Sequence, residues 1–144
     1  MKTIDRSVLI NYSAEQMYSL VNDIESYPSF MKGCVDARVL RSEEGLIEAR
    51  LTLCHANIRQ SFATRNELCP PTSITMHLLE GPFQRFEGRW QFDSLAEDAC
   101  KVSLHLDFAF NNPLLMLAVG KLFEHSITQQ VDSLCRRADV LFGK

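Results

Sequence analysis

Apolar and polar residues alternate along most of the middle of the chain. Between residues 35 and 110, several segments carry an apolar side chain at every second position, as in Phe86–Phe92 and Val102–Phe110. Such alternation is typical of a strand with one buried and one solvated face. Links rich in Gly and Pro, such as Cys69–Pro71 and Glu80–Pro82, separate neighbouring segments. The pattern therefore predicts about six strands joined as an antiparallel meander.

The N-terminal part of the chain predicts a strand followed by helices. Thr3–Tyr12 alternates in the same way as the later segments. Ser13 and Gln16 have the spacing of a capping box, which predicts a helix that continues through the apolar stripe of Met17–Ile24. A second short helix or turn follows and is interrupted by Pro28.

The last predicted helix is long and changes character along its length. Asn112-Pro113 is typical of a cap and first helical position, and a helix from there to Phe142 would be about 45 Å long. Its second half has an apolar stripe, with Gln130 among the polar residues mostly off it; the stripe is Ile127, Val131, Leu134, Ala138 and Leu141. Its first half is apolar on nearly all sides. That half must either be covered by the Met17–Ile24 helix and the Tyr27–Phe30 segment or serve as a docking surface.

Together these elements predict one α+β domain over residues 1–144, in the order β-α-α-β6-α. Seven strands would make a sheet about 34 Å wide, whereas one helix is only about 10–12 Å across. A strongly curved sheet wrapped around the long helix removes this mismatch, and it would enclose either packed side chains or a cavity. Gly88 lies mid-strand on the inward side, where a bend or a close approach is easiest.

Composition and charge narrow the function classes. The 144 residues are 46% hydrophobic with a net charge of −3, which excludes a disordered chain and a basic field over the whole surface for nucleic acid. Five cysteines without a C-x-x-C pair favour free thiols over a zinc site or a disulfide framework. The start of the chain carries charges where a signal peptide would be apolar, and no apolar run is long enough to span a bilayer. We therefore expect a cytoplasmic protein.

Catalytic motifs are scarce. The sequence has no phosphate-binding glycine loop, zinc-protease motif or nucleophile elbow. His77 and His105 fall on the solvated side of their strands, and the adjacent Cys54 and His55 would point to opposite faces. No catalytic residue or metal ligand is predicted, so a binding protein is favoured over an enzyme.

Three stretches follow the pattern of a known family. They include Tyr12-Ser13 with Asp23-Ile24-Glu25 and Tyr27-Pro28, then Glu80-Gly81-Pro82-Phe83 with Gly88 and Trp90, then Cys100-Lys101-Val102 with Gly120 and Phe123. In this order they resemble the START-like superfamily of polyketide cyclases and lipid-transport proteins. The resemblance covers essentially the whole chain. It is strongest to the branch that holds coenzyme-Q-binding proteins and bacterial ribosome-association toxins.

The resemblance implies a helix-grip fold, in which a curved antiparallel sheet of about seven strands wraps around a long C-terminal helix. It implies a non-enzymatic protein with an apolar cavity for a lipid or an isoprenoid quinone such as ubiquinone, supporting respiration or lipid handling. The same branch implies an alternative, a toxin that binds the large ribosomal subunit and blocks subunit joining. An aromatic or polyketide cyclase is a third interpretation. It would need polar groups inside the cavity, and the inward positions offer few.

The site residues follow from the inward pattern and from the resemblance. The expected ligand cavity is lined by Phe62, Met76, Leu78, Phe86, Gly88, Trp90, Phe92, Leu104, Phe108, Gly120, Phe123, Ile127 and Val131. The expected gate is Tyr27, Pro28 and Phe30, and the alternative is that these residues form a plain hydrophobic plug. The expected docking surface is Leu114, Leu115, Ala118 and Leu122. An ordinary packed core remains the alternative to the cavity.

The expected partners are a hydrophobic small molecule, the large ribosomal subunit and transient contact with a membrane, with no DNA. The only expected cofactor is a bound ubiquinone or other apolar ligand. A ribosome-binding protein needs a locally basic surface. The solvated strand faces instead mix both signs: Arg50, Arg59, Arg65, Arg85 and Arg89 with Glu48, Glu67, Glu87 and Asp107.

Overall fold

A computed structural model describes residues 2–55 and 57–143; the side chains of His55 and Leu122 lie outside that description. Its elements, in chain order, are β1 (Lys2–Ile10), α1 (Ala14–Asn22), the 3-10 turn η1 (Ile24–Ser26), α2 (Tyr27–Phe30), β2 (Cys34–Glu43), β3 (Leu46–His55), β4 (Ile58–Cys69), β5 (Ser73–Glu80), β6 (Phe83–Ala96), β7 (Ala99–Phe110) and α3 (Pro113–Phe142).

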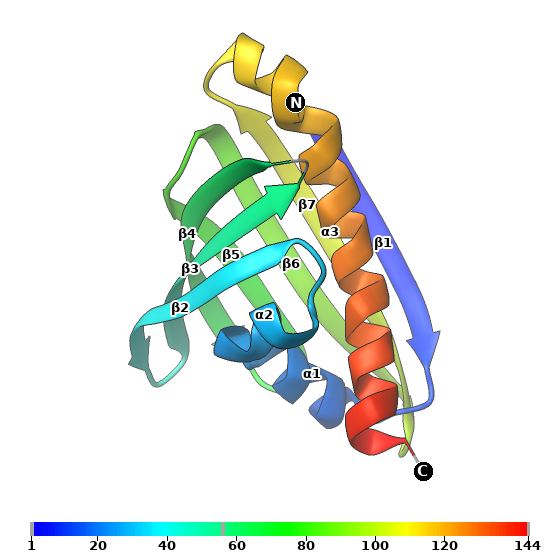
Figure 1. Ribbon diagram of the computed structural model, residues 1–144. Coiled ribbons are helices and arrows are strands. Elements are labelled where there is room, and N and C mark those ends of the chain that lie inside the picture. Colours follow the sequence, from blue (N-terminus) through cyan, green and yellow to red (C-terminus); the bar gives the residue numbers. More distant parts are fainter. Residues whose placement is uncertain (1, 56, 144) are drawn as a thin grey trace.

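The strands form one antiparallel sheet in the order β1-β7-β6-β5-β4-β3-β2. The sheet curves around α3, with β1 alongside the helix and β2 on the opposite edge (Figure 1). Helices α1 and α2 lie beside the C-terminal half of α3, at one open end of the curve (Figure 1). The predicted α+β helix-grip architecture is confirmed, and the alternating pattern explains it, because it places one apolar face toward α3.

Local capping confirms where two helices begin. The Gln16 backbone N–H donates to the Ser13 hydroxyl at 3.1 Å, and the Ser13 N–H donates to the Gln16 side-chain oxygen at 3.0 Å. At α3, the Leu114 N–H donates to the Asn112 side-chain oxygen at 2.8 Å. Pro28 differs from expectation, since it lies in the first turn of α2, where no N–H is needed for the helix, and does not interrupt it.

The core lies between the concave face of the sheet and α3. An aromatic cluster occupies one part of it, with Phe108 and Phe123 ring centroids 4.8 Å apart and Phe83 and Phe110 stacked at 4.9 Å. On α3 the buried side includes Leu134 and Ala138, 1% and 0% exposed. Gln130 belongs to this side too, at 7% exposed, so the expectation that it lies off the apolar stripe is wrong. Gln130 lies about 40° from Leu134 around the helix, on one flank of the stripe, and this flank is still inside the groove of the sheet.

Candidate functional site

The cavity bordered by the most predicted residues, called the main cavity below, lies between the concave face of the sheet and α3, and the end of α1 and the start of α2 help to close it. Its volume, counted over the positions that the centre of a water molecule can occupy, is about 50 Å³. Its lining residues are Val21, Asn22, Ile24, Tyr27, Ala49, Leu51, Phe62, Thr64, Asn66, Ile74, Met76, Phe86, Trp90, Leu104, Leu106, Ile127 and Gln130. A single water needs about 10–15 Å³ of such space, and an apolar cavity of about 150 Å³ holds benzene. The cavity as it stands therefore has room for a few waters and not for a ring.

The structure places the predicted cavity residues in three groups. Those that line the main cavity are Phe62, Met76, Phe86, Trp90, Leu104 and Ile127. Phe123 lines a smaller neighbouring space of about 30 Å³. Phe92, Phe108 and Val131 are buried in the core, Leu78 is half-buried, and none of these four is among the residues of the main cavity.

At both predicted glycines, a methionine side chain occupies the space that a Cβ atom would need. A Cβ at Gly88 would lie 2.5 Å from the Met76 methyl group and 3.1 Å from the Leu106 Cδ1. A Cβ at Gly120 would lie 2.8 Å from the Met116 sulfur, on the same helix. Neither glycine is among the lining residues of the cavity. Gly88 acts on it indirectly, because it lets Met76, which does line the cavity, lie close against β6.

Polar side chains line part of the cavity, which overturns the expectation of few polar groups there. The Thr64 hydroxyl donates to the Asn66 side-chain oxygen at 2.8 Å, and both residues are buried. The side-chain oxygen of Asn22 is buried without a hydrogen-bond partner among the described residues. The hydroxyl of Tyr27 donates to the Val21 carbonyl, and burial raises the pKa of this tyrosine. Thr64 and Asn66 share the inward alternation of Phe62, so the signal was present in the sequence.

The predicted gate residues occupy α2, between the cavity and the surface. Tyr27 is buried and lines the cavity, Phe30 is half-buried, and Pro28 is exposed. The Tyr27 and Phe30 rings pack edge to face at 5.9 Å between centroids, and the Arg137 guanidinium of α3 lies 5.3 Å from the centre of the Phe30 ring. That α2 opens as a gate stays a prediction, and a plain hydrophobic plug stays its alternative.

The first half of α3 is left uncovered in part. Leu114 is 73% exposed, Ala118 is exposed and Leu115 is half-buried, while the Leu122 side chain lies outside the described residues. Leu117, which the sequence analysis did not single out, is 85% exposed. Helices α1 and α2 lie by the other half of α3 (Figure 1), so of the two alternatives, cover by these helices does not hold for this surface. No helix among the described residues is long and apolar enough to cross a bilayer.

The outer face of the sheet carries its charges in pairs. Most of its arginines have a carboxylate within 3.4 Å: Arg50–Glu80, Arg65–Glu48 and Arg85–Glu87. Arg59 and Arg89 are exposed and have no ion-pair partner in the part of the chain that the structure describes. The predicted mixture of signs is therefore confirmed.

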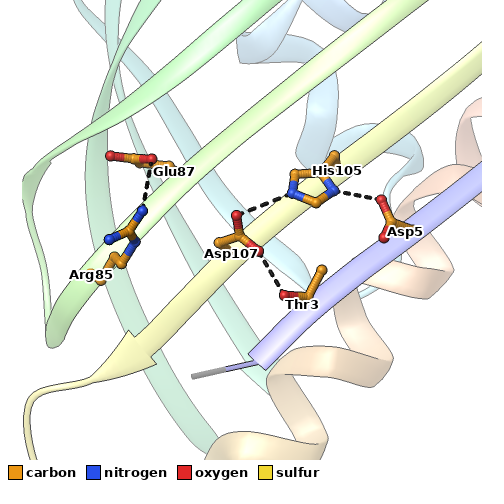
Figure 2. A network of polar contacts seen from close by, with 6 residues as sticks. All are labelled: Thr3, Asp5, Arg85, Glu87, His105 and Asp107. Carbon is orange, nitrogen blue, oxygen red and sulfur yellow. Dashed lines mark hydrogen bonds and ion pairs between the residues drawn. The ribbon is translucent and has the colours of Figure 1, made fainter.

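A polar network joins β1 to β7 on this face (Figure 2). The His105 ring lies between Asp5, at 2.5 Å from Nδ1, and Asp107, at 3.1 Å from Nε2, and the Thr3 hydroxyl donates to Asp107 at 2.7 Å. The hydrogen bond to Asp5 and then that to Asp107 raise the pKa of His105. His105 is half-exposed and far from the cavity side of the sheet, so the network joins two strands and does not face a substrate site. In residues 2–55 and 57–143, no group of three or more His, Cys, Asp or Glu side chains is arranged so that it could hold a metal ion.

Comparison with known proteins places this geometry in a family. The family model described as polyketide cyclase/dehydrase and lipid transport matches residues 10–135. Ribosome association toxin RatA of Vibrio cholerae is 42% identical over 144 residues, all of both chains. The mitochondrial coenzyme Q-binding protein COQ10 homolog B of Xenopus laevis is 23% identical over 142 residues, 96% of this chain and 58% of that protein.

Among solved structures, the ZhuI aromatase/cyclase of Streptomyces sp. R1128 superposes with a TM-score of 0.86 over 96% of this chain and 93% of its own. At 16% identity, that likeness shows the fold alone. The sequence match over most of the chain and the shared architecture agree. This chain belongs to the polyketide cyclase/dehydrase and lipid transport family and has its START-like fold.

Proposed function

We propose that this protein associates with the ribosome. The observation that carries the proposal is the 42% identity to ribosome association toxin RatA over the full length of both chains. The relative named for coenzyme Q binding is much more distant, at 23% identity. The expected target is the large ribosomal subunit, as the resemblance to this branch implies.

A binding role, not catalysis, is the simplest account of the side chains. The cavity is lined by apolar groups, amides and hydroxyls, and no Asp, Glu, Lys, Arg or His is among its lining residues. General acid–base chemistry needs a titratable group within hydrogen-bond reach of the substrate. The ZhuI neighbour makes a cyclase an alternative, but the only titratable group in the lining among the described residues is the Tyr27 hydroxyl, which donates to the Val21 carbonyl.

Sedimentation tests the proposal directly. Purified protein is mixed with separated large and small ribosomal subunits and run through a sucrose gradient at increasing salt. We expect it to move with the large subunit at low salt and to be released as salt rises, because contacts between basic groups and phosphates weaken with salt. Protein that stays at the top of the gradient with both subunits at low salt would contradict the proposal. Movement with the small subunit alone would contradict the expected target.

The Arg59→Glu, Arg89→Glu double variant asks which surface is used. Both side chains are exposed and without ion-pair partners among the described residues, so their replacement should leave the fold intact. Reduced cosedimentation would place the contact on the outer face of the sheet. Unchanged cosedimentation at every salt concentration would exclude that face.

A second candidate function is the binding of an apolar ligand such as a lipid or a quinone. The cavity between the sheet and α3 favours it, and so does the relative named for coenzyme Q binding. A ligand of this size requires the cavity to enlarge, and α2 is the segment that would have to move as a gate. Native mass spectrometry of the purified protein should reveal a bound hydrophobic molecule. Hydrogen exchange at Tyr27–Phe30 should slow when that molecule is added back; unchanged exchange at saturation would identify α2 as a plug.

A further inference from the structure

The start of α3 presents apolar side chains to solvent. Leu114 and Leu117 are 73% and 85% exposed, and Ala118 is exposed as well. These three residues lie on one side of the helix, within about 100° of one another. The first turns of α3, yellow to orange in Figure 1, also project beyond the ends of the neighbouring strands. An apolar helix end that projects in this way can enter another phase or contact another molecule without a change of fold.

A positive charge accompanies these apolar side chains. Lys121 is exposed on the same side of α3, one turn after Leu117. It makes no ion pair with another described residue, and it is the only charged residue between Asn111 and Phe123. We call the surface formed by Leu114, Leu117, Ala118 and Lys121 the α3 tip. Because the whole chain has a net charge of −3, an anionic surface attracts this tip and repels much of the rest.

An open hollow adjoins the same end of α3, on the side that faces β1 and β7. Its volume is about 210 Å³, and its lining residues are Lys2, Phe108, Ala109, Phe110, Pro113 and Met116. An apolar cavity of about 150 Å³ is enough to hold benzene, so the hollow has room for a short apolar segment. The only charged residue in its lining is Lys2, whose Nζ lies 3.8 Å from the Glu124 carboxylate.

The charge and the leucines together favour one kind of occupant. A second copy of the chain would bring another Lys121 into the contact, and the α3 tip has no acidic side chain to pair with it. An RNA backbone would match the charge but would leave Leu114 and Leu117 in water. The interface of an anionic membrane supplies acyl chains for the leucines and phosphates for the lysine.

We propose that the α3 tip docks on an anionic membrane surface, with Leu114 and Leu117 entering the boundary between headgroups and acyl chains and with Lys121 contacting lipid phosphate. This contact is separate from the proposed association with the ribosome and uses none of the residues tested for it. It is weak and reversible, because two leucines bury less apolar surface than a myristoyl chain, which by itself gives only marginal attachment.

Cosedimentation with lipid vesicles tests the docking. The protein should bind vesicles of phosphatidylcholine mixed with phosphatidylglycerol, more weakly as salt rises, and should bind pure phosphatidylcholine vesicles less well. The Leu114→Ser, Leu117→Ser double variant should bind the mixed vesicles at least about tenfold more weakly, because the apolar contribution is lost. Lys121→Gln should weaken binding about fivefold on the mixed vesicles and little on pure phosphatidylcholine.

Val140→Ser is the matched control, since Val140 is 72% exposed on the same helix but close to its other end. It should bind the mixed vesicles as the wild type does, and all variants should melt near the wild-type temperature. Failure of the wild type to bind the mixed vesicles would overturn the inference. Binding that survives the double leucine variant, or that falls as much in Val140→Ser, would overturn it too.

Two other measurements distinguish the alternative occupants. A wild-type dimer in analytical ultracentrifugation that the double leucine variant converts to a monomer would assign the α3 tip to a second copy. Loss of cosedimentation with the large ribosomal subunit in that variant, without vesicle binding by the wild type, would assign the tip to the ribosome. Either result overturns the membrane contact, and the second one leaves the proposed function standing.

Discussion

The close packing of Met76 against Gly88 should be measurable as an interaction free energy between the two positions. A methyl group added at Gly88 would lie 2.5 Å from the Met76 methyl carbon, far inside van der Waals contact, and 3.1 Å from the Leu106 Cδ1. The Gly88→Ala variant therefore has to displace Met76. Because the Met76 methyl is the end of a flexible side chain, moving it should cost about 1 kcal/mol, the low end of the range for overpacking, whereas replacing a mid-strand glycine by alanine gains about 0.5–1 kcal/mol through reduced chain entropy. We expect a net loss of at most about 0.5 kcal/mol.

The same substitution should behave differently once Met76 is shortened. In a Met76→Ala background the close methyl contact is gone and only the Leu106 contact remains, which a small shift relieves. Gly88→Ala should then be neutral or stabilising by up to about 1 kcal/mol. The interaction energy between the two sites should be about 1 kcal/mol, above the 0.3–0.5 kcal/mol scatter of independent sites.

Urea denaturation of the four proteins in this cycle measures the interaction, with unchanged m values showing that unfolding remains comparable. Leu78→Ala is the matched control, because Leu78 lies on the same face of β5 but is not among the nearest atoms to Gly88. Gly88→Ala should cost the same in that background as in the wild type. Equal costs in the Met76→Ala and wild-type backgrounds would refute the packing argument.

Three further predictions concern single side chains. Burial raises the pKa of Cys34 to about 11, so iodoacetamide at pH 8 should label the exposed Cys69 well before Cys34; equal labelling by mass spectrometry would contradict that burial. NMR should give His105 a pKa above its ordinary value, and the Asp5→Asn variant should lower that pKa. Because the folded pKa is raised, protonation of His105 should stabilise the fold fully below about pH 6.5. This stabilisation should be lost as the pH rises through the folded pKa. Leu117→Ser should change the free energy of unfolding by less than about 0.5 kcal/mol, since the side chain is 85% exposed; a larger loss in thermal melts would mean that this leucine packs against the protein.

The fold could be predicted because the alternation of apolar and polar residues within each strand determines which of its faces is buried. In β6 and β7 the alternation of residues such as Trp90 and Leu104 fixes which face is buried, and the register then follows from short turns. The capping box of Ser13 and Gln16 fixes the start of α1 in the same local way. Such signals need no knowledge of distant parts of the chain.

The polar part of the cavity could not be predicted in this way, because its members meet only in the folded protein. Thr64 and Asn66 lie on the inward positions of β4, but the sequence does not show that they face empty space and not a packed neighbour. Asn22 ends α1 and reaches the cavity only because that helix closes one end of the curved sheet (Figure 1). Gln130 lies at the flank of an apolar stripe, a position that is exposed on a helix over a flat sheet. The curvature of this sheet buries it, and curvature is a property of all seven strands together.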